Sequence, residues 1–330
     1  MSNKNLLSTH LLIAALLSLS FSGCETSRDK MHLKEEPSAT QDVIATSSKS
    51  DVIDLPIAQP TAPRITVWVH GTHFWFNKMF KSMTAQEEGV YLASDLPNDY
   101  LYRKLIVNRL CKAAPCEFNH EHFYILSWTG VLSSRARINA ARSLLRDLKK
   151  ICAAYREKYG AQPAICLITH SHGGNVALNL EVVNDPQDPI IIDKLVMLAV
   201  PVQVETAQYV KSRYFKKIYS LYSTYDMIQI GDMQRFGYHI DDPQRSSIPL
   251  FSGRKFEPCE NLLQVKVRFD GVGPFHLSFI LSTFVLALPD ILATLDQVPL
   301  PIQNCEPMIL RLKRNKIPIL FSEAETPRRF

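Results

Sequence analysis

The sequence predicts an α/β protein whose mainly parallel sheet is covered by helices on both faces. Short apolar runs alternate along the chain with longer stretches that carry apolar residues at helical spacing. The short runs are continuously apolar, as expected for strands that are buried on both sides. With 330 residues, 46% of them hydrophobic, the chain is long enough to bury the core that such a sheet needs.

The first residues are expected to direct export. Lys4 precedes an apolar stretch over 11–21, which is too short to span a bilayer as a helix but suits a signal-peptide core. The Ser-Gly-Cys that ends at Cys24 resembles the lipobox of bacterial lipoproteins, whose cysteine is acylated. Phe21 departs from this box, which usually has Leu there. A plain secretory signal that is cut nearby, or an uncleaved anchor, is the alternative.

The resulting organisation has four parts. We expect a signal peptide over 1–23, a flexible Ser-, Thr-, Lys- and Pro-rich tether over 24–63, a globular domain over 64–298 and a tail without assigned structure over 299–330. Two or three acyl chains on Cys24 would hold the protein on a bacterial membrane, since a single chain binds only marginally. Glu25 is not the Asp that resembles an inner-membrane retention signal, so the outer membrane is favoured.

Within the domain, short apolar runs alternate with longer amphipathic ones. Strands are predicted at 65–69, 123–128, 164–169, 195–200, 218–223 and 262–268, and helices at 137–159, 175–183 and 276–295. The first helix ends at Gly160, and the last is expected to be interrupted near Pro289. Strands that alternate with helices in this way favour parallel pairing.

The motif with the clearest chemistry spans 165–175 and reads Ile-Cys-Leu-Ile-Thr-His-Ser-His-Gly-Gly-Asn. A buried strand runs into Thr169, then Ser171, then two glycines and a helix. A serine hydroxyl is a weak nucleophile, so it must project from a sharp turn where a base can reach it. The helix that follows directs its backbone N–H groups towards developing negative charge.

This arrangement resembles the nucleophile elbow of α/β-hydrolases, especially lipases and esterases, and the resemblance covers roughly residues 64–295. Thr169 replaces the first Gly of the Gly-x-Ser-x-Gly pattern, whereas Gly173 and Gly174 follow the His-Ser-x-Gly-Gly form of lipases. The resemblance implies an α/β-hydrolase fold with at most a small lid. It also implies a serine hydrolase that cleaves carboxylic esters of lipids or other long-chain acyl groups through an acyl-enzyme.

The resemblance further implies the other members of the site. Backbone N–H groups of Thr72, in the loop after the first strand, and of His172 would bind the oxyanion, while His70 would brace that loop. Asp226, beyond the strand at 218–223, is in the position of the family's acid, which fixes the imidazole tautomer and stabilises the imidazolium. His276, after a Gly-rich loop beyond the last strand, is in the position of the base.

Several alternatives stay open. Asp232 could replace Asp226 as the acid, and the aromatic segment 73–80 could line an acyl pocket, form a lid or belong to the core. Cys111 and Cys116 could pair in an exported protein. The whole domain could also be a catalytically inert surface lipoprotein that binds a lipid or a protein partner.

Other classes of function are disfavoured. His170 and His172 resemble the start of the metallo-β-lactamase signature, but Gly174 and Asn175 stand where it needs Asp and His. Two histidines cannot supply the three or four protein ligands of a zinc site, so we expect neither a metal nor another cofactor. A net charge of +5 without a dense basic stripe argues against a nucleic-acid partner.

Overall fold

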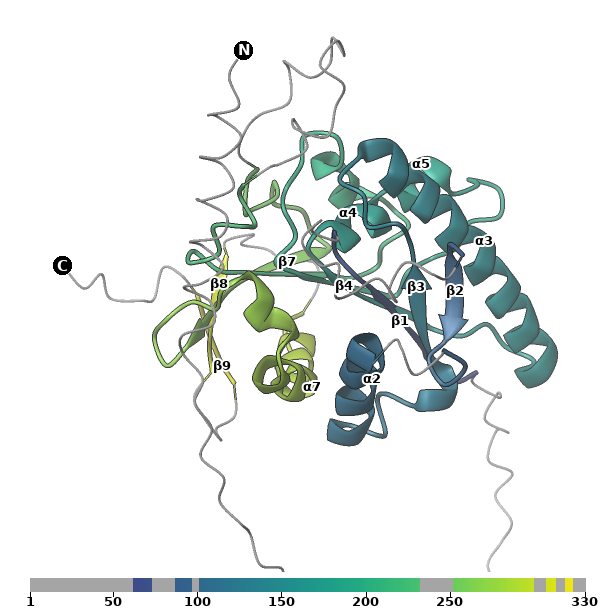
Figure 1. Ribbon diagram of the computed structural model, residues 1–330, viewed down its shortest axis with the longest axis horizontal. Helices are drawn as coiled ribbons and strands as arrows, with labels where there is room; N and C mark the ends of the chain where they lie inside the picture. Colours follow the sequence, from purple (N-terminus) through teal and green to yellow (C-terminus); the bar gives the residue numbers. More distant parts are fainter. Residues whose placement is uncertain are drawn as a thin grey trace, which may run out of the picture. The chain divides into compact units, whose positions relative to one another are not determined.

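A nine-stranded sheet forms the centre of the described part of the chain (Figure 1). Its strands are β1 (Ile65–Val69), β2 (Gly89–Leu92), β3 (Phe123–Ser127), β4 (Ile165–His170), β5 (Lys194–Leu198), β6 (Ile218–Tyr222), β7 (Leu262–Phe269), β8 (Met308–Leu312) and β9 (Ile319–Ser322). Their order across the sheet is β2-β3-β1-β4-β5-β6-β7-β8-β9. All pairs from β3 to β8 are parallel, and β2 and β9 lie antiparallel at the two edges. The predicted mainly parallel sheet is therefore confirmed.

This computed structural model describes residues 62–72, 87–96, 101–231, 252–299, 307–312 and 318–322. All of them belong to the unit that begins at Pro60. The predictions for the signal peptide, Cys24, most of the tether, the aromatic segment and Asp232 lie outside the described residues. Within the described ranges, no helix is long and apolar enough to cross a membrane.

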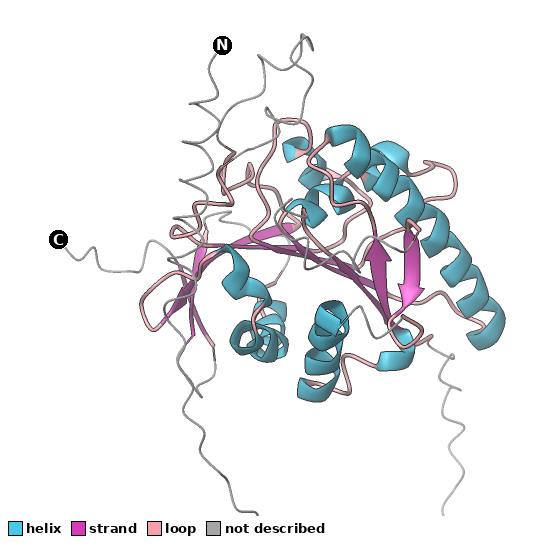
Figure 2. Ribbon diagram, in the orientation of Figure 1, coloured by secondary structure: helices cyan, strands magenta, loops and turns pink. Residues whose placement is uncertain are grey.

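Helices cover both faces of the sheet (Figure 2). On one face lie α2 (Leu101–Ala113) and α7 (Ser282–Asp296), and on the other α3 (Ser134–Tyr159), α4 (His172–Leu178) and α5 (Leu180–Val183). Trp68 and Ile168 belong to the apolar layer of the first face, and Val67 and Leu167 to that of the second. Successive residues of a strand thus enter opposite layers, which explains why β1 and β4 are apolar throughout.

The strand register brings one end of the sheet together as a platform for the site. Val69 of β1 pairs with Thr169 of β4, and His170 of β4 pairs with Leu198 of β5. The loops that follow these parallel strands therefore emerge at the same edge. Candidate residues of four loops, from Gly71 to His276, follow β1, β4, β6 and β7.

The long helix α3 begins three residues earlier than predicted and ends at Tyr159, as predicted. The Ser133 hydroxyl accepts a hydrogen bond from the Ala136 N–H at 3.5 Å, which caps the first turn. At the other end Gly160 has φ 70°, a left-handed conformation that favours glycine, and its N–H donates to the Arg156 carbonyl.

The last predicted helix differs from the structure. It is interrupted at Leu281, which is extended with φ −78° and ψ 160°, rather than near Pro289. A 3₁₀ turn, η6 (His276–Ile280), precedes the break, and α7 then continues through Pro289 to Asp296. Pro289 costs the helix one backbone hydrogen bond, but it is buried with Leu288 and Ile291, and this packing offsets the loss.

The structure also contains elements that the sequence did not predict. These are β2, α2 and the two strands β8 and β9, which lie in the tail that was left without assigned structure. Cys152 and Cys166 are buried, as expected for core residues, and both are free thiols. Cys111 and Cys116 are free thiols as well. Cys111 belongs to α2 and is buried, whereas Cys116 is exposed.

Candidate active site

Ser171 occupies the sharp turn between β4 and α4. Its backbone has φ 52° and ψ −135°, a conformation that costs a residue with a Cβ free energy and is common at functional sites. The Ser171 N–H donates to the Leu198 carbonyl at 2.9 Å, so the turn is fastened to the end of β5. The side chain is 7% exposed and lies at the edge of the sheet where the neighbouring loops meet.

The two glycines after Ser171 are required by close packing. A Cβ at Gly173 would lie 2.4 Å from the Val69 carbonyl oxygen, and one at Gly174 would lie 2.3 Å from Val200 Cγ2. Real Cβ atoms do not approach so closely. Thr169 has no such conflict, since it is the fifth residue of β4 and its hydroxyl donates to the Val196 carbonyl at 3.0 Å. The departure from Gly at this position is therefore compatible with the turn.

Asp226 and His276 form a buried pair beside this turn. The His276 Nδ1–H donates to Asp226 Oδ2 at 2.8 Å, and both side chains are at most 3% exposed. The other carboxylate oxygen, Oδ1, accepts the Gln229 N–H at 2.9 Å. Because Nδ1 is engaged by the carboxylate, Nε2 is the nitrogen of His276 that is left to accept a proton.

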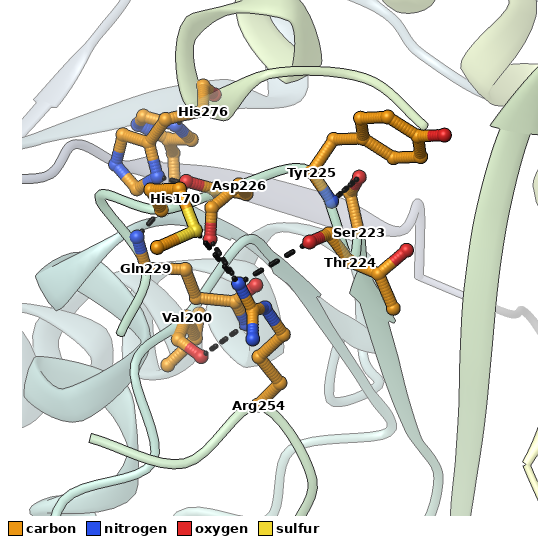
Figure 3. Close-up of polar contacts among 10 residues, drawn as sticks. His170, Val200, Ser223, Thr224, Tyr225, Asp226, Gln229, Arg254 and His276 are labelled. Atoms are coloured by element: carbon orange, nitrogen blue, oxygen red, sulfur yellow. Dashed lines mark hydrogen bonds and ion pairs between the residues drawn. The ribbon is translucent and has the colours of Figure 1, made fainter. Parts of the chain in front are cut away.

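His170 links β4 to the segment that carries His276 (Figure 3). Its Nε2 lies 3.1 Å from the His276 carbonyl oxygen, and the two rings are 4.7 Å apart between centroids. A carbonyl can only accept, so His170 must donate its Nε2–H. Burial, and then the nearby His276, lower the pKa of His170 to about 3, so it remains neutral near pH 7.

The loop after β1 lies directly against Ser171. A Cβ on Gly71 would be 2.7 Å from Ser171 Cβ, so the backbone before Thr72 approaches the serine closely. His70 stacks on Trp128 at 5.5 Å, and the Trp128 Nε1–H donates to the His70 carbonyl at 2.9 Å. These contacts with Trp128 fix the side chain and the carbonyl group of His70, which is the residue expected to brace the loop.

His172 is the first residue of α4 and is 7% exposed. Its Nδ1 is buried and has no hydrogen-bond partner among the residues that the structure describes. Burial, followed by the charge of Arg137, holds the pKa of His172 well below its usual range, so the ring is neutral. In the described ranges, no three His, Cys, Asp or Glu side chains are grouped so that they could hold a metal ion.

Four supporting residues escaped the sequence interpretation: Trp128, Val200, Gln229 and Arg254. Each acts on a backbone group or on a glycine, and such contacts leave no motif in the sequence. Gln229 is a partial exception. Its position three residues after Asp226 is the spacing of a carboxylate that caps a backbone N–H, and this could have favoured Asp226 as an ordered acid.

Among known proteins, similarity is found to solved structures. No protein-family model matches the chain, and no curated protein matches it. Similar solved structures include a thermostable esterase from Pseudomonas putida, with 14% identity and a TM-score of 0.27 over 47% of this chain and 41% of that one. An α/β serine hydrolase homologue from Coxiella burnetii has 12% identity and a TM-score of 0.36 over 73% and 89%. An esterase from the archaeon Pyrobaculum calidifontis has 11% and 0.35 over 78% and 67%.

The chain thus spans less than half the length of the first of these proteins. Identities and TM-scores of this size do not carry an argument about activity. The fold follows from the chain itself: a parallel sheet covered on both faces, a serine turn between a central strand and a helix, and an acid and a histidine after later strands. This is the α/β-hydrolase fold, as predicted.

Proposed function

We propose that the protein is a serine hydrolase that cleaves carboxylic esters, with Ser171 as nucleophile, His276 as base and Asp226 as its orienting acid. The observation that carries this proposal is the buried 2.8 Å hydrogen bond between His276 Nδ1 and Asp226 Oδ2 beside a strained serine turn. A buried carboxylate fixes the imidazole tautomer and stabilises the imidazolium that forms when the serine is deprotonated.

The reaction proceeds in two halves. Ser171 Oγ attacks the ester carbonyl carbon while its proton passes to His276 Nε2. The tetrahedral oxyanion accepts hydrogen bonds from the backbone N–H groups of Thr72 and His172, each worth about 3 kcal/mol of transition-state stabilisation. Collapse releases the alcohol, which takes the proton from His276. Water then attacks the acyl-serine by the same steps and releases the acid.

The substrates that we propose are esters of lipids or other long-chain acyl groups. Apolar side chains are exposed immediately beside the acid and the base: Tyr225 and Met227 are 50% and 51% exposed, and Phe275 is 43% exposed. A Cβ on Gly273 would lie 2.6 Å from Tyr225 Cδ2, so the loops that carry these residues are in contact. Exposed apolar groups at the mouth of a site favour apolar ligands.

Location adds to the proposal. An acylated Cys24 would place the enzyme on a bacterial membrane, where acyl esters are concentrated. The outer membrane is favoured over the inner one. The substrate partner is then a lipid or acyl ester at that surface, and the membrane is the second partner.

A fluorophosphonate probe tests the serine chemistry directly. Full-length protein in detergent is incubated with the probe, and the modified peptide is located by mass spectrometry. We expect one adduct on Ser171, absent from Ser171→Ala and from heat-denatured protein. Asp226→Asn should slow labelling about a thousandfold or more, because the asparagine favours the wrong tautomer of His276. Esters of increasing acyl length then test the substrate class, and turnover should rise with length.

A protein that unfolds cooperatively, yet leaves Ser171 unmodified, would contradict the proposal and favour the inert lipid-binding alternative. Labelling that is equal in wild type and Asp226→Asn would show that Asp226 is not the acid. Faster turnover of acetyl esters than of long acyl esters would contradict the lipid assignment alone.

A further inference from the structure

The turn that carries Asp226 is held mainly by short local hydrogen bonds. The Tyr225 N–H donates to Ser223 Oγ at 3.1 Å, and the Gln229 N–H donates to Asp226 Oδ1 at 2.9 Å. Gln229 also donates through Nε2 to the Val200 carbonyl at 2.9 Å. This hydrogen bond ties the end of the turn after Asp226 to the loop that follows β5. Where the backbone passes from Thr224 to Asp226, the Asp226 N–H also donates to the Ser223 carbonyl at 3.4 Å.

Arg254 adds a further restraint on this stretch from 28 residues further along the chain (Figure 3). Its Nη2 donates to the Asp226 carbonyl at 2.8 Å and lies 3.4 Å from the Thr224 carbonyl and 3.7 Å from Met227 Sδ. One guanidinium nitrogen therefore reaches the backbone on both sides of the acid. A hydrogen bond from a charged donor is about twice as strong as one between neutral groups.

The segment that carries Arg254 is itself held by backbone hydrogen bonds to two neighbouring loops. The Ser252 N–H donates to the Ile230 carbonyl at 2.7 Å. Gly253 and Val202 exchange two backbone hydrogen bonds, at 2.9 Å and 3.2 Å, as an antiparallel bridge. The backbone that carries the Arg254 guanidinium is thus fixed by hydrogen bonds on both sides.

We propose that Arg254 is a positioning residue that sets the distance between Asp226 and His276 by holding the backbone of the acid's turn. Within the described part of the chain, its hydrogen bonds go to Thr224, Asp226 and Met227, so it would act through the turn of Asp226. For its effect on catalysis the inference rests on the proposed hydrolase function. Its geometric part, the hydrogen bond between Asp226 and His276, is testable without turnover.

The test compares Arg254→Ala and Arg254→Lys with Lys255→Ala, a matched loss of charge at the neighbouring, exposed position. The first readout is the proton resonance of His276 Nδ1–H, which a hydrogen bond to a carboxylate moves far downfield and which is assigned by its loss in Asp226→Ala. We expect this resonance to move upfield or broaden away in Arg254→Ala, to be partly retained in Arg254→Lys and to be unchanged in Lys255→Ala.

The second readout is the rate of fluorophosphonate labelling. A small misplacement of a catalytic group costs about a hundredfold in rate, so Arg254→Ala should lose about 10- to 100-fold. Free guanidinium at millimolar concentration should restore part of this rate in Arg254→Ala, and none of the rate lost in Asp226→Asn. A residue that only stabilised the surface would allow no such selective rescue.

The outcomes separate the two proposals. A wild-type Nδ1–H resonance in Arg254→Ala would overturn the positioning role, whatever the labelling rate. A perturbed resonance in a protein whose Ser171 never reacts would support the positioning role while the hydrolase proposal fails. If Arg254→Ala does not fold, Arg254→Lys decides alone, and a wild-type resonance and labelling rate in that variant would overturn the inference.

Discussion

Burial keeps His170 neutral, and this makes the free energy of unfolding depend on pH. The folded protein holds the pKa of His170 at about 3, below the ordinary value of 6.5, because the ring is fully buried next to His276. The unfolded chain therefore binds a proton at His170 between these two values, while the folded protein does not. The stability contributed by neutral His170 is present above pH 6.5 and is lost as the pH falls towards 3.

His170→Gln tests this sign, because the glutamine amide can still donate to the His276 carbonyl but does not titrate. Between pH 7 and pH 4, the free energy of unfolding of the wild type should fall by about 3 kcal/mol more than that of His170→Gln. Urea unfolding at both pH values measures the difference. Parallel losses in the two proteins would mean that His170 is protonated as easily in the folded state as in the unfolded chain.

At this scale, the sequence revealed the residues whose chemistry and neighbours form a pattern. Ser171 stood out because a strand, a turn and two glycines surround it, and His276 because of its place after a Gly-rich loop. Arg254 and Trp128 could not be found in this way. Their partners are carbonyl groups of Asp226 and His70, and every residue has a carbonyl, so no residue type marks the contact.

At the scale of elements, the end of α3 depends on one backbone conformation. Gly160 has φ 70°, and a Cβ added there would meet nothing within 4 Å. Gly160→Ala should therefore lower the free energy of unfolding by about 1 kcal/mol through backbone strain alone. Gly160→Asn, whose side chain tolerates the left-handed region, should cost less. Thermal and urea unfolding of both variants check this, and an alanine variant as stable as wild type would contradict it.

Elements were predictable where a continuous apolar run marked a buried strand or where helical spacing ended at a glycine. Six strands met the first condition and α3 met the second. The strand β2 has only four residues, of which Gly89 alone is fully buried, so its pattern is too short to recognise. The break at Leu281 was also hidden, because an extended residue between two apolar turns carries no glycine or proline to mark it. Pro289 gave the wrong position, since packing outweighed the local propensity.

At the scale of the whole molecule, the sheet is completed by a segment that the sequence left without structure. β8 pairs in parallel with β7, and β9 closes the edge antiparallel to β8. β9 contacts α7, and Leu310 of β8 shares an apolar layer with Leu288 of that helix. In the sequence, the short apolar runs of these strands are consistent with either a strand or an unstructured tail. The tail forms strands because β7 offers an edge with which β8 can pair, and because the adjoining apolar layer buries its side chains. Neither condition can be read from the tail's own sequence.

Leu310 and Ile319 measure how far this tail belongs to the cooperative core. Leu310 of β8 is fully buried in the apolar layer with Val267 and Leu288, whereas Ile319 of β9 is 47% exposed. Leu310→Ala should lower the free energy of unfolding by about 2–5 kcal/mol, and Ile319→Ala, a similar truncation in the neighbouring strand, by less than about 1 kcal/mol. Urea unfolding, followed by tryptophan fluorescence and by circular dichroism, should give one coincident transition for each variant. Equal, small losses would mean that β8 folds apart from the sheet, whereas the expected difference makes the tail a structural part of the α/β domain.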